Sequence, residues 1–278
     1  MTTLELDVGV TRDGVVVISH ERRLHPDTAR GPDGKWLAAP GPAIRSLTYA
    51  ELERYDVGRL NPASDYARRF PAQVPADGAR IPRLADLFAL VRKARNDAVR
   101  FNIETKVSPE APGETLPPAE LARALIAAIR AGGMASRSTI QSFDWRSLAI
   151  VQAEAPEIPT VYLSAQQRWL DNIRAGDPAG SPWTAGVQLA RYGSVPRMVK
   201  AAGGAIWSPW LGDLDAAQLA EAHALGLKVI PWTVSRPAQL EALLALGVDG
   251  VISDRPDLAR EAMRRAGMPL PAATPVAP

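Results

Sequence analysis

The chain has 278 residues, of which 46% are hydrophobic and 22% charged, and its formal net charge is +2. This composition suits one large folded domain and excludes a disordered chain. Lys and Arg are scattered rather than gathered into a basic stripe, so no nucleic-acid partner is expected. The absence of cysteine excludes disulfides, thiolate metal sites and cysteine nucleophiles. No apolar run reaches the length of a membrane span, and the compartment stays open between cytoplasm and periplasm.

Short apolar runs rich in Val, Ile and Thr alternate with segments of helical periodicity. The sequence predicts strands at Thr2–Val8, Val15–Ser19, Phe101–Lys106, Ser138–Ser142, Pro159–Leu163, Ala205–Ser208, Lys228–Val234 and Gly250–Ser253. Apolar residues at helical spacing predict helices around Leu84–Val91, Leu121–Ile129 and Leu240–Leu244, and Asp144 is placed to cap a helix over Trp145–Ala155. This alternation is typical of parallel strands joined by crossover helices.

Three segments depart from the alternation. Only Thr11–Gly14 separates Val15–Ser19 from the first strand, so we interpret it as a strand-like extension rather than a crossover. The stretch from Pro26 to Ile81 is rich in Gly, Pro and Arg and predicts a long loop with short helices at the catalytic face. Residues 269–278 are mostly Pro and Ala and predict a disordered tail, which leaves 1–268 as one domain.

Two predicted strands each carry acidic residues on one face. Alternation along a strand places Glu5 with Asp7, and Glu104 with Lys106. On either strand alone, a solvated polar face is the simpler interpretation. Carboxylates repeated on two strands of an α/β pattern instead favour a site for a hard cation such as Mg²⁺ or Ca²⁺, because buried carboxylates need a counter-charge. Lys106, nearer the mouth, is placed to meet a phosphate.

His20 follows the strand-like extension. Histidine is the residue type most often used for proton transfer near neutral pH, which suits protonation of a leaving alkoxide at such a site. An ordinary surface histidine is the alternative. The chain has three histidines, and we interpret His25 and His223 as structural or exposed.

The motifs and their order resemble the glycerophosphodiester phosphodiesterase family. The opening block is Leu4–Val8, Thr11–Gly14 and Val16–His20, followed by Ile81–Leu84, Ile103–Lys106, Gln141–Phe143, Pro231–Val234 and Gly247–Asp254. These matches span residue 4 to about residue 256. The resemblance implies a TIM (β/α)8 barrel, an α/β fold, with its catalytic residues at the carboxyl ends of the strands.

The resemblance also implies roles for individual residues. Glu5, Asp7 and Glu104 would bind a divalent cation, Mg²⁺ or Ca²⁺. His20 would be the general acid and Lys106 would contact the phosphate. Trp232 would line the glycerol pocket and Phe143 would be part of the pocket wall, although both also suit large core residues. The implied reaction is hydrolysis of a small-molecule glycerophosphodiester to an alcohol and glycerol 3-phosphate.

One expected block is not found. The family begins with a strand ending in His-Arg-Gly, followed by Pro-Glu-Asn, whereas Met1 falls within what should be the second strand. We therefore expect the first strand and helix to be missing, together with a catalytic His, an Arg and a carboxylate ligand. Loss of one proton-transfer group alone lowers rates by about 10²–10⁴-fold, so this chain is expected to be nearly inactive. Our hypothesis is a misassigned start, with both motifs encoded upstream in frame.

Two alternatives stay open. One is another barrel phosphodiesterase acting on phospholipids, similar to sphingomyelinase D or the phosphoinositide phospholipases. The other is a non-catalytic relative that binds metal or ligand. The oligomeric state and the preferred alcohol group are not predicted.

Overall fold

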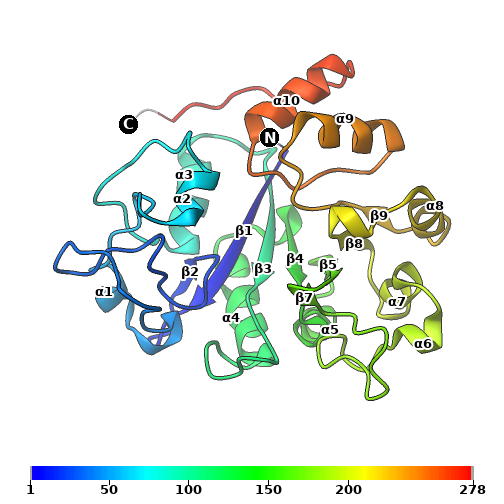
Figure 1. Ribbon diagram of the computed structural model, residues 1–278, viewed down its shortest axis with the longest axis horizontal. Helices are drawn as coiled ribbons and strands as arrows, with labels where there is room; N and C mark the ends of the chain where they lie inside the picture. Colours follow the sequence, from blue (N-terminus) through cyan, green and yellow to red (C-terminus); the bar gives the residue numbers. More distant parts are fainter. Residues whose placement is uncertain (1, 277–278) are drawn as a thin grey trace.

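The computed structural model describes residues 2–276, and a seven-stranded sheet forms its centre (Figure 1). The strand order is β2-β1-β3-β4-β5-β8-β9, with every neighbouring pair parallel except β1 and β2. The strands are β1 (Thr3–Val10), β2 (Val16–Ile18), β3 (Arg100–Thr105), β4 (Ser138–Ser142), β5 (Thr160–Ser164), β8 (Ile206–Pro209) and β9 (Lys228–Val229). A separate hairpin pairs β6 (Gln166–Gln167) with β7 (Leu170–Asp171).

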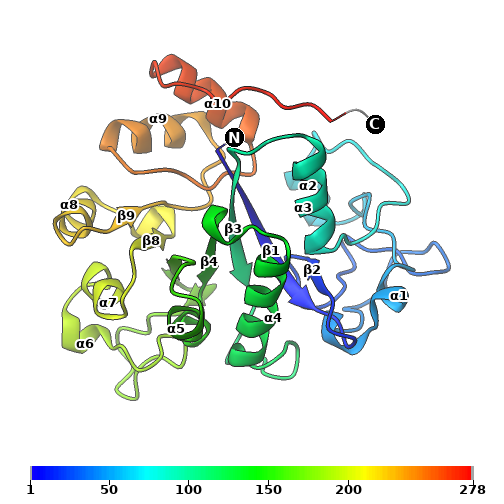
Figure 2. The same ribbon diagram turned by 180° about the vertical axis from the view of Figure 1, so that it is seen from behind.

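The longer helices surround the sheet on its outside (Figures 1 and 2). They are α3 (Leu84–Lys93), α4 (Pro118–Ala131), α5 (Trp145–Glu154), α7 (Val195–Ala201), α8 (Ala216–Ala224), α9 (Pro237–Leu246) and α10 (Pro256–Arg265). The short helices are η1 (Ile44–Ser46), α1 (Tyr49–Leu52), α2 (Asp65–Arg69), η2 (Ala135–Arg137), α6 (Leu189–Tyr192) and η3 (Leu211–Asp213). No helix in the described part of the chain is long and apolar enough to cross a bilayer.

The main core lies between the sheet and these helices. Phe101 and Ile103 of β3 pack there with Leu125 and Ile129 of α4, all of them fully buried. The predicted cap of α5 is confirmed, because the Asp144 side chain accepts a hydrogen bond from the Arg146 backbone N–H. Burial of alternating apolar residues on β3 and of one stripe on α4 thus holds the strand in place.

Two predicted strands differ from the structure. The strand expected over Lys228–Val234 ends at Val229, and Gly250–Ser253 is not a strand. The two segments still lie side by side, because Val234 N–H donates to Ile252 O (2.8 Å) and Ile252 N–H donates to Pro231 O (3.0 Å). Pro231 has no N–H to donate, which interrupts a regular ladder at this point.

The prediction of a TIM barrel is confirmed at the level of an α/β sheet ringed by helices, but closure is not found. Within residues 2–276, no strand pairing joins β9 or the segment after it to β1. The outer edge of β1 is instead bordered at Val8–Val10 by the antiparallel β2. The strand-like extension predicted at Val15–Ser19 is therefore the edge strand of this sheet.

The long segment after β2 carries η1, α1 and α2 and has a small core of its own. That core includes Leu24, Ile44, Leu52 and Ile81, and it packs on Val17 of β2. The segment lies beside β1 and β2 (Figure 1).

At the other end of the chain, residues 269–276 form neither helix nor strand. Asn96 Nδ2 donates a hydrogen bond to Thr274 Oγ1 (2.9 Å), and Arg260 donates one to Pro271 O (3.3 Å). Disorder of the tail stays a prediction, and residues 277–278 lie outside the described part of the chain.

Candidate metal centre and active site

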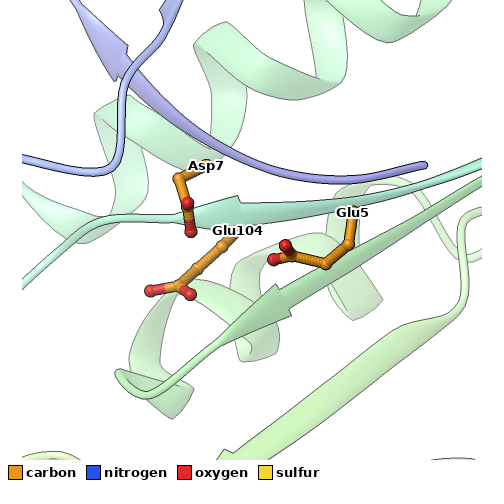
Figure 3. Close-up of side chains that lie close together, drawn as sticks. All are labelled: Glu5, Asp7 and Glu104. Atoms are coloured by element: carbon orange, nitrogen blue, oxygen red, sulfur yellow. The ribbon is translucent and has the colours of Figure 1, made fainter. Parts of the chain in front are cut away.

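Three carboxylates converge between β1 and β3. In the parallel register of these strands Asp7 pairs with Glu104 and Glu5 pairs with Asn102, so alternation directs all four side chains to one face. Ligand oxygens of Glu5, Asp7 and Glu104 all lie within 4.8 Å of one another, and Figure 3 shows the carboxylates turned toward one another. The three expected metal ligands therefore form one group, the carboxylate cluster.

Lys106 is the counter-charge of this cluster. Its Nζ lies 3.1 Å from Asp7 Oδ1 and 3.1 Å from Glu104 Oε1. Burial opposes the charge on Lys106, but Glu104 and Asp7 outweigh it, so the pKa of Lys106 lies above its usual value. Lys106 is charged at neutral pH for this reason.

Burial and mutual repulsion also raise the pKa values of acidic groups in the cluster. For a carboxyl, unlike for Lys106, a raised pKa favours the uncharged form. Partial removal of water from the Glu5 carboxyl, with the charge of Asp7 adding to the effect, raises its pKa to about 7, although the residue as a whole is exposed. Burial also raises the pKa of Glu104, which is 5% exposed, although Lys106 opposes the shift. With all three carboxyls ionised, the cluster would carry more negative charge than one ammonium balances, and a second cation would relieve this imbalance. All-oxygen ligands with excess negative charge fit a hard divalent cation.

Buried amides hold Glu5 in place from the neighbouring strands. Gln141 of β4 donates a hydrogen bond to Glu5 and accepts one from Asn102 Nδ2 (2.6 Å). Asn102 in turn accepts a hydrogen bond from Thr139 Oγ1 (2.7 Å). Alternation along β3 places Asn102 on the face of Glu104. The sequence alone did not reveal the relay, because the relay depends on the alignment of three strands.

His20 lies on the rim rather than within the cluster. It follows β2, and its side chain is 71% exposed. Its Nδ1 lies 2.8 Å from Glu21 Oε1, and this hydrogen bond lowers the pKa of Glu21 despite burial. The backbone N–H of Ser19, the residue before His20, donates a hydrogen bond to Asp7 O (2.9 Å), which holds this segment beside the strand that carries the cluster.

The other two histidines have separate acidic partners. His25 Nδ1 lies 3.6 Å from Asp27, and His223 Nε2 lies 3.0 Å from Asp249. Both are partly exposed, and His223 lies on α8. Neither contacts the carboxylate cluster.

A small cavity beside Lys106 brings in residues that sequence reasoning missed. Its lining includes Glu21, Arg22, Arg45 and Glu114 together with Lys106. Arg22 Nε donates to Glu114 (2.8 Å), and Arg45 donates to the backbone oxygen of Thr115 (2.8 Å). Part of the long segment after β2 therefore borders the site, as expected, through Arg45.

The expected pocket aromatics lie across the mouth at the same edge of the sheet. Phe143 follows β4 and Trp232 follows β9, and their rings meet edge to face with centroids 5.2 Å apart. Trp232 Nε1 donates a hydrogen bond to Ser208 O (2.9 Å). Both side chains are partly exposed, and Trp169 and Trp210, which sequence reasoning missed, join them.

The fold and the site define an α/β enzyme of the barrel type, with acidic, basic and aromatic side chains gathered at the carboxyl ends of parallel strands. The chain belongs to the glycerophosphoryl diester phosphodiesterase family, because the model of that family matches residues 1–258. It is thereby placed among the phosphoric diester hydrolases.

Individual relatives agree with this assignment. A glycerophosphodiester phosphodiesterase of Caldanaerobacter subterraneus subsp. tengcongensis is 25% identical over 264 residues, covering 95% of this chain and 86% of that protein. One of Bacillus subtilis is 26% identical over 263 residues, covering 92% and 74%. The crystal structure of a candidate glycerophosphoryl diester phosphodiesterase from Silicibacter pomeroyi is 32% identical, with a TM-score of 0.83 and coverage of 98% and 86%.

A more distant structure shares the fold. A phosphodiesterase of Oleispira antarctica, solved in complex with the product sn-glycerol-3-phosphate, is 20% identical with a TM-score of 0.64. The match covers 95% of this chain and 85% of the Oleispira antarctica chain.

Proposed function

We propose that this chain hydrolyses glycerophosphodiesters to an alcohol and glycerol 3-phosphate with the help of a divalent cation, Mg²⁺ or Ca²⁺. The observation that carries the proposal is the convergence of three carboxylates with Lys106, from within β1 and from the carboxyl end of β3. The names of the relatives support it, as does the sn-glycerol-3-phosphate in the Oleispira antarctica structure.

Glu5, Asp7 and Glu104 would hold the cation. When bound, a divalent cation polarises the phosphoryl group and neutralises charge as the transition state forms. Lys106 supplies a permanent positive charge. Once another cation neutralises the carboxylates, the Lys106 side chain can turn toward a phosphate oxygen.

In hydrolysis, a water oxygen bonds to phosphorus while the bond from phosphorus to the alcohol oxygen breaks. The attacking water gives up a proton to solvent, and this proton balances the one that His20 gives away and later regains from solvent. His20 would give its proton to the leaving alkoxide, which departs as the neutral alcohol. Glu21 would orient the ring through its contact with Nδ1. Trp232 and Phe143 would contact the organic part of the substrate.

We also propose that turnover by this chain is slow. His20 is the one histidine that the described residues bring near the carboxylate cluster, so a second proton-transfer group of this type is missing there. Such a group contributes about 10²–10⁴-fold to a rate.

The test is hydrolysis of glycerophosphocholine, with release of glycerol 3-phosphate measured in Mg²⁺, in Ca²⁺ and in a chelator. Activity that requires a cation and is abolished in Glu104→Gln, but kept in Glu120→Gln on the exposed start of α4, supports the proposal. Cation-independent activity, or equal activity in both variants, contradicts it. Sphingomyelin and phosphatidylinositol serve as parallel substrates, and hydrolysis of these alone would favour a phospholipid-directed enzyme.

A non-catalytic binding role is the second candidate. It is favoured by the two ion pairs of Lys106, which engage Asp7 and Glu104 within the chain itself and hold Lys106 away from a phosphate. Cation binding by the wild-type chain, without hydrolysis of any diester, would support this role.

A further inference from the structure

Four aromatic rings gather at one side of the mouth and form what we call the aromatic cluster. Its members are Phe143, Trp169, Trp210 and Trp232. Trp210 lies 5.3 Å from Trp169 and 5.4 Å from Trp232 between ring centroids, and Trp169 lies 6.0 Å from Trp232. Each pair of neighbouring rings meets edge to face. The rings therefore present faces in several directions around one point instead of stacking.

The cluster is anchored at its base and open at its top. The backbone N–H of Trp210 donates to Ser164 O (2.8 Å), and the backbone N–H of Leu211 donates to Trp232 O (2.9 Å). Trp169, in contrast, is 60% exposed. An indole left in water forgoes the free energy that its burial would yield, so its exposed face is available to a ligand.

Asp213 fixes Trp169 above the other rings. Trp169 lies in the turn between β6 and β7, and Asp213 accepts hydrogen bonds from Gln166 N–H and from the Gln167 side chain. Asp213 ends η3, which begins directly after Trp210. The hairpin with Trp169 is thus tied to the segment that carries Trp210.

An acidic hollow borders the aromatic cluster. It has a volume of about 320 Å³, and its lining includes Gln166, Gly212, Asp213 and Asp215. Gly212 lies against the Trp210 indole, since a Cβ there would be 2.8 Å from Nε1. Among residues 2–276, neither aspartate takes part in a salt bridge; they accept hydrogen bonds from Gln166, Gln167 and Gln218. The surroundings of the rings therefore favour a cation.

The aromatic cluster and the carboxylate cluster share one edge of the sheet. Gln141 of β4 contacts Glu5, and Phe143 follows β4 by one residue, where its ring packs against Trp232. Trp210 comes directly after β8, and Trp232 comes soon after β9. One end of a phosphodiester bound at the carboxylates would extend toward the rings.

We propose that Trp169 and Trp210, which pack against Trp232, form a subsite for a quaternary ammonium group, which makes a choline-bearing glycerophosphodiester the preferred substrate. The proposal rests on the proposed hydrolysis and names the alcohol that it releases. A trimethylammonium group is weakly hydrated and spreads its charge over methyl groups, so several ring faces can surround it through cation–π attraction. A primary ammonium needs hydrogen-bond acceptors that indole faces do not offer.

The first experiment compares kcat/KM for glycerophosphocholine and glycerophosphoethanolamine, which differ only in the methyl groups on nitrogen. The choline diester is expected to be preferred about fivefold or more. Trp169→Ala is expected to bring this ratio close to one, whereas Trp169→Phe keeps most of it. Trp36→Ala, whose ring lies under Arg30 in the segment after β2, is the matched control and keeps the ratio.

The second experiment measures binding without turnover. Choline and its neutral isostere 3,3-dimethylbutanol are titrated into wild type and Trp169→Ala, followed by tryptophan fluorescence. Choline is expected to bind wild type several-fold more tightly than the isostere, and this difference is lost in the variant.

The outcomes separate the two proposals. Choline binding that depends on Trp169, without hydrolysis of any diester, sinks the proposed hydrolysis but supports the subsite. Hydrolysis at equal rates for both headgroups keeps the proposed function and overturns the subsite. An unchanged ratio of kcat/KM for the two diesters in Trp169→Ala also overturns the subsite. So does sedimentation that shows a dimeric wild type and a monomeric Trp169→Ala, because the exposed indole would then belong to a contact between two copies.

Discussion

Asp7 and Glu104 face each other in register across β1 and β3, and the Lys106 ammonium lies 3.1 Å from an oxygen of each. Two carboxylates that would otherwise repel each other are joined by one buried cation. Because a divalent cation would need the same oxygens, Lys106 and the metal compete for them. Stability and cation binding are therefore coupled at this site.

Replacing Lys106 by Met leaves Asp7 and Glu104 without a counter-charge. In a chelator, the free energy of unfolding is expected to fall by about 3–5 kcal/mol, as when one partner of a buried ion pair is removed. Added Ca²⁺ should restore more stability to the variant than it adds to wild type. Urea unfolding with and without Ca²⁺ measures both effects. Lys35→Met, at an exposed turn, is the control, and an equal loss in the two variants would contradict the coupling.

Removing the Glu5 carboxylate takes away one of the three proposed oxygen ligands. Glu5→Ala is expected to weaken the apparent affinity for Mg²⁺ and Ca²⁺ about tenfold or more, because affinity at such sites depends on the charge of the ligand set. The measurement is the shift of Tm with cation concentration. Glu120→Gln should match wild type. If Glu5→Ala responds to cations as wild type does, these carboxylates are not the binding site.

Gln141 is expected to act through Glu5. Its side chain is 1% exposed, and Gln141→Leu would free Glu5 to rotate and leave the Asn102 amide unpaired. Removing such an orienting partner typically lowers metal affinity about 10–100-fold, with a loss of stability of about 1–3 kcal/mol.

A matched variant separates orientation from stability for Gln141. Gln152→Leu removes hydrogen bonds to Thr160 and Tyr162 but leaves the carboxylate cluster intact. It should cost stability without changing cation affinity in calorimetric titration. Similar affinities in both variants would show that Gln141 has only a packing role.

Tyr162 makes alkaline pH destabilising. Burial raises the pKa of its hydroxyl to about 12, and the hydroxyl donates a 2.7 Å hydrogen bond to Ala202 O. The unfolded chain loses this proton near pH 10. Between pH 10 and 12 the unfolded state therefore binds fewer protons than the folded state, and the free energy of unfolding decreases as pH rises.

Tyr162→Phe lacks this titration. At pH 8 it should be less stable than wild type by about 1 kcal/mol, for the lost hydrogen bond. The difference in the free energy of unfolding between wild type and Tyr162→Phe should narrow or reverse by pH 11. Only wild type has the Tyr162 titration, whereas other alkaline titrations are common to both chains. Urea unfolding at the two pH values measures it, and a constant gap would refute a buried, neutral Tyr162.

Local regularity made much of the fold predictable from sequence. Strand β4 and helices α3, α4 and α5 follow from apolar periodicity and the Asp144 cap, because these signals act over a few residues. The regular strand expected at 250–253 did not form. Its ladder partner includes Pro231, and the effect of that residue depends on which segment lies beside it.

Alternation along β1 and β3 by itself determined that Glu5 shares a face with Asp7, and Glu104 with Lys106, because side-chain direction in a strand is a property of the local backbone. Only the tertiary structure decided that Asp7 lies opposite Glu104, that Gln141 reaches Glu5, and that Trp169 and Trp210 join Trp232. These relationships depend on the register of strands and the docking of a hairpin far apart in sequence. Pairing between distant segments is selected by the packing of the whole core, which no local pattern encodes.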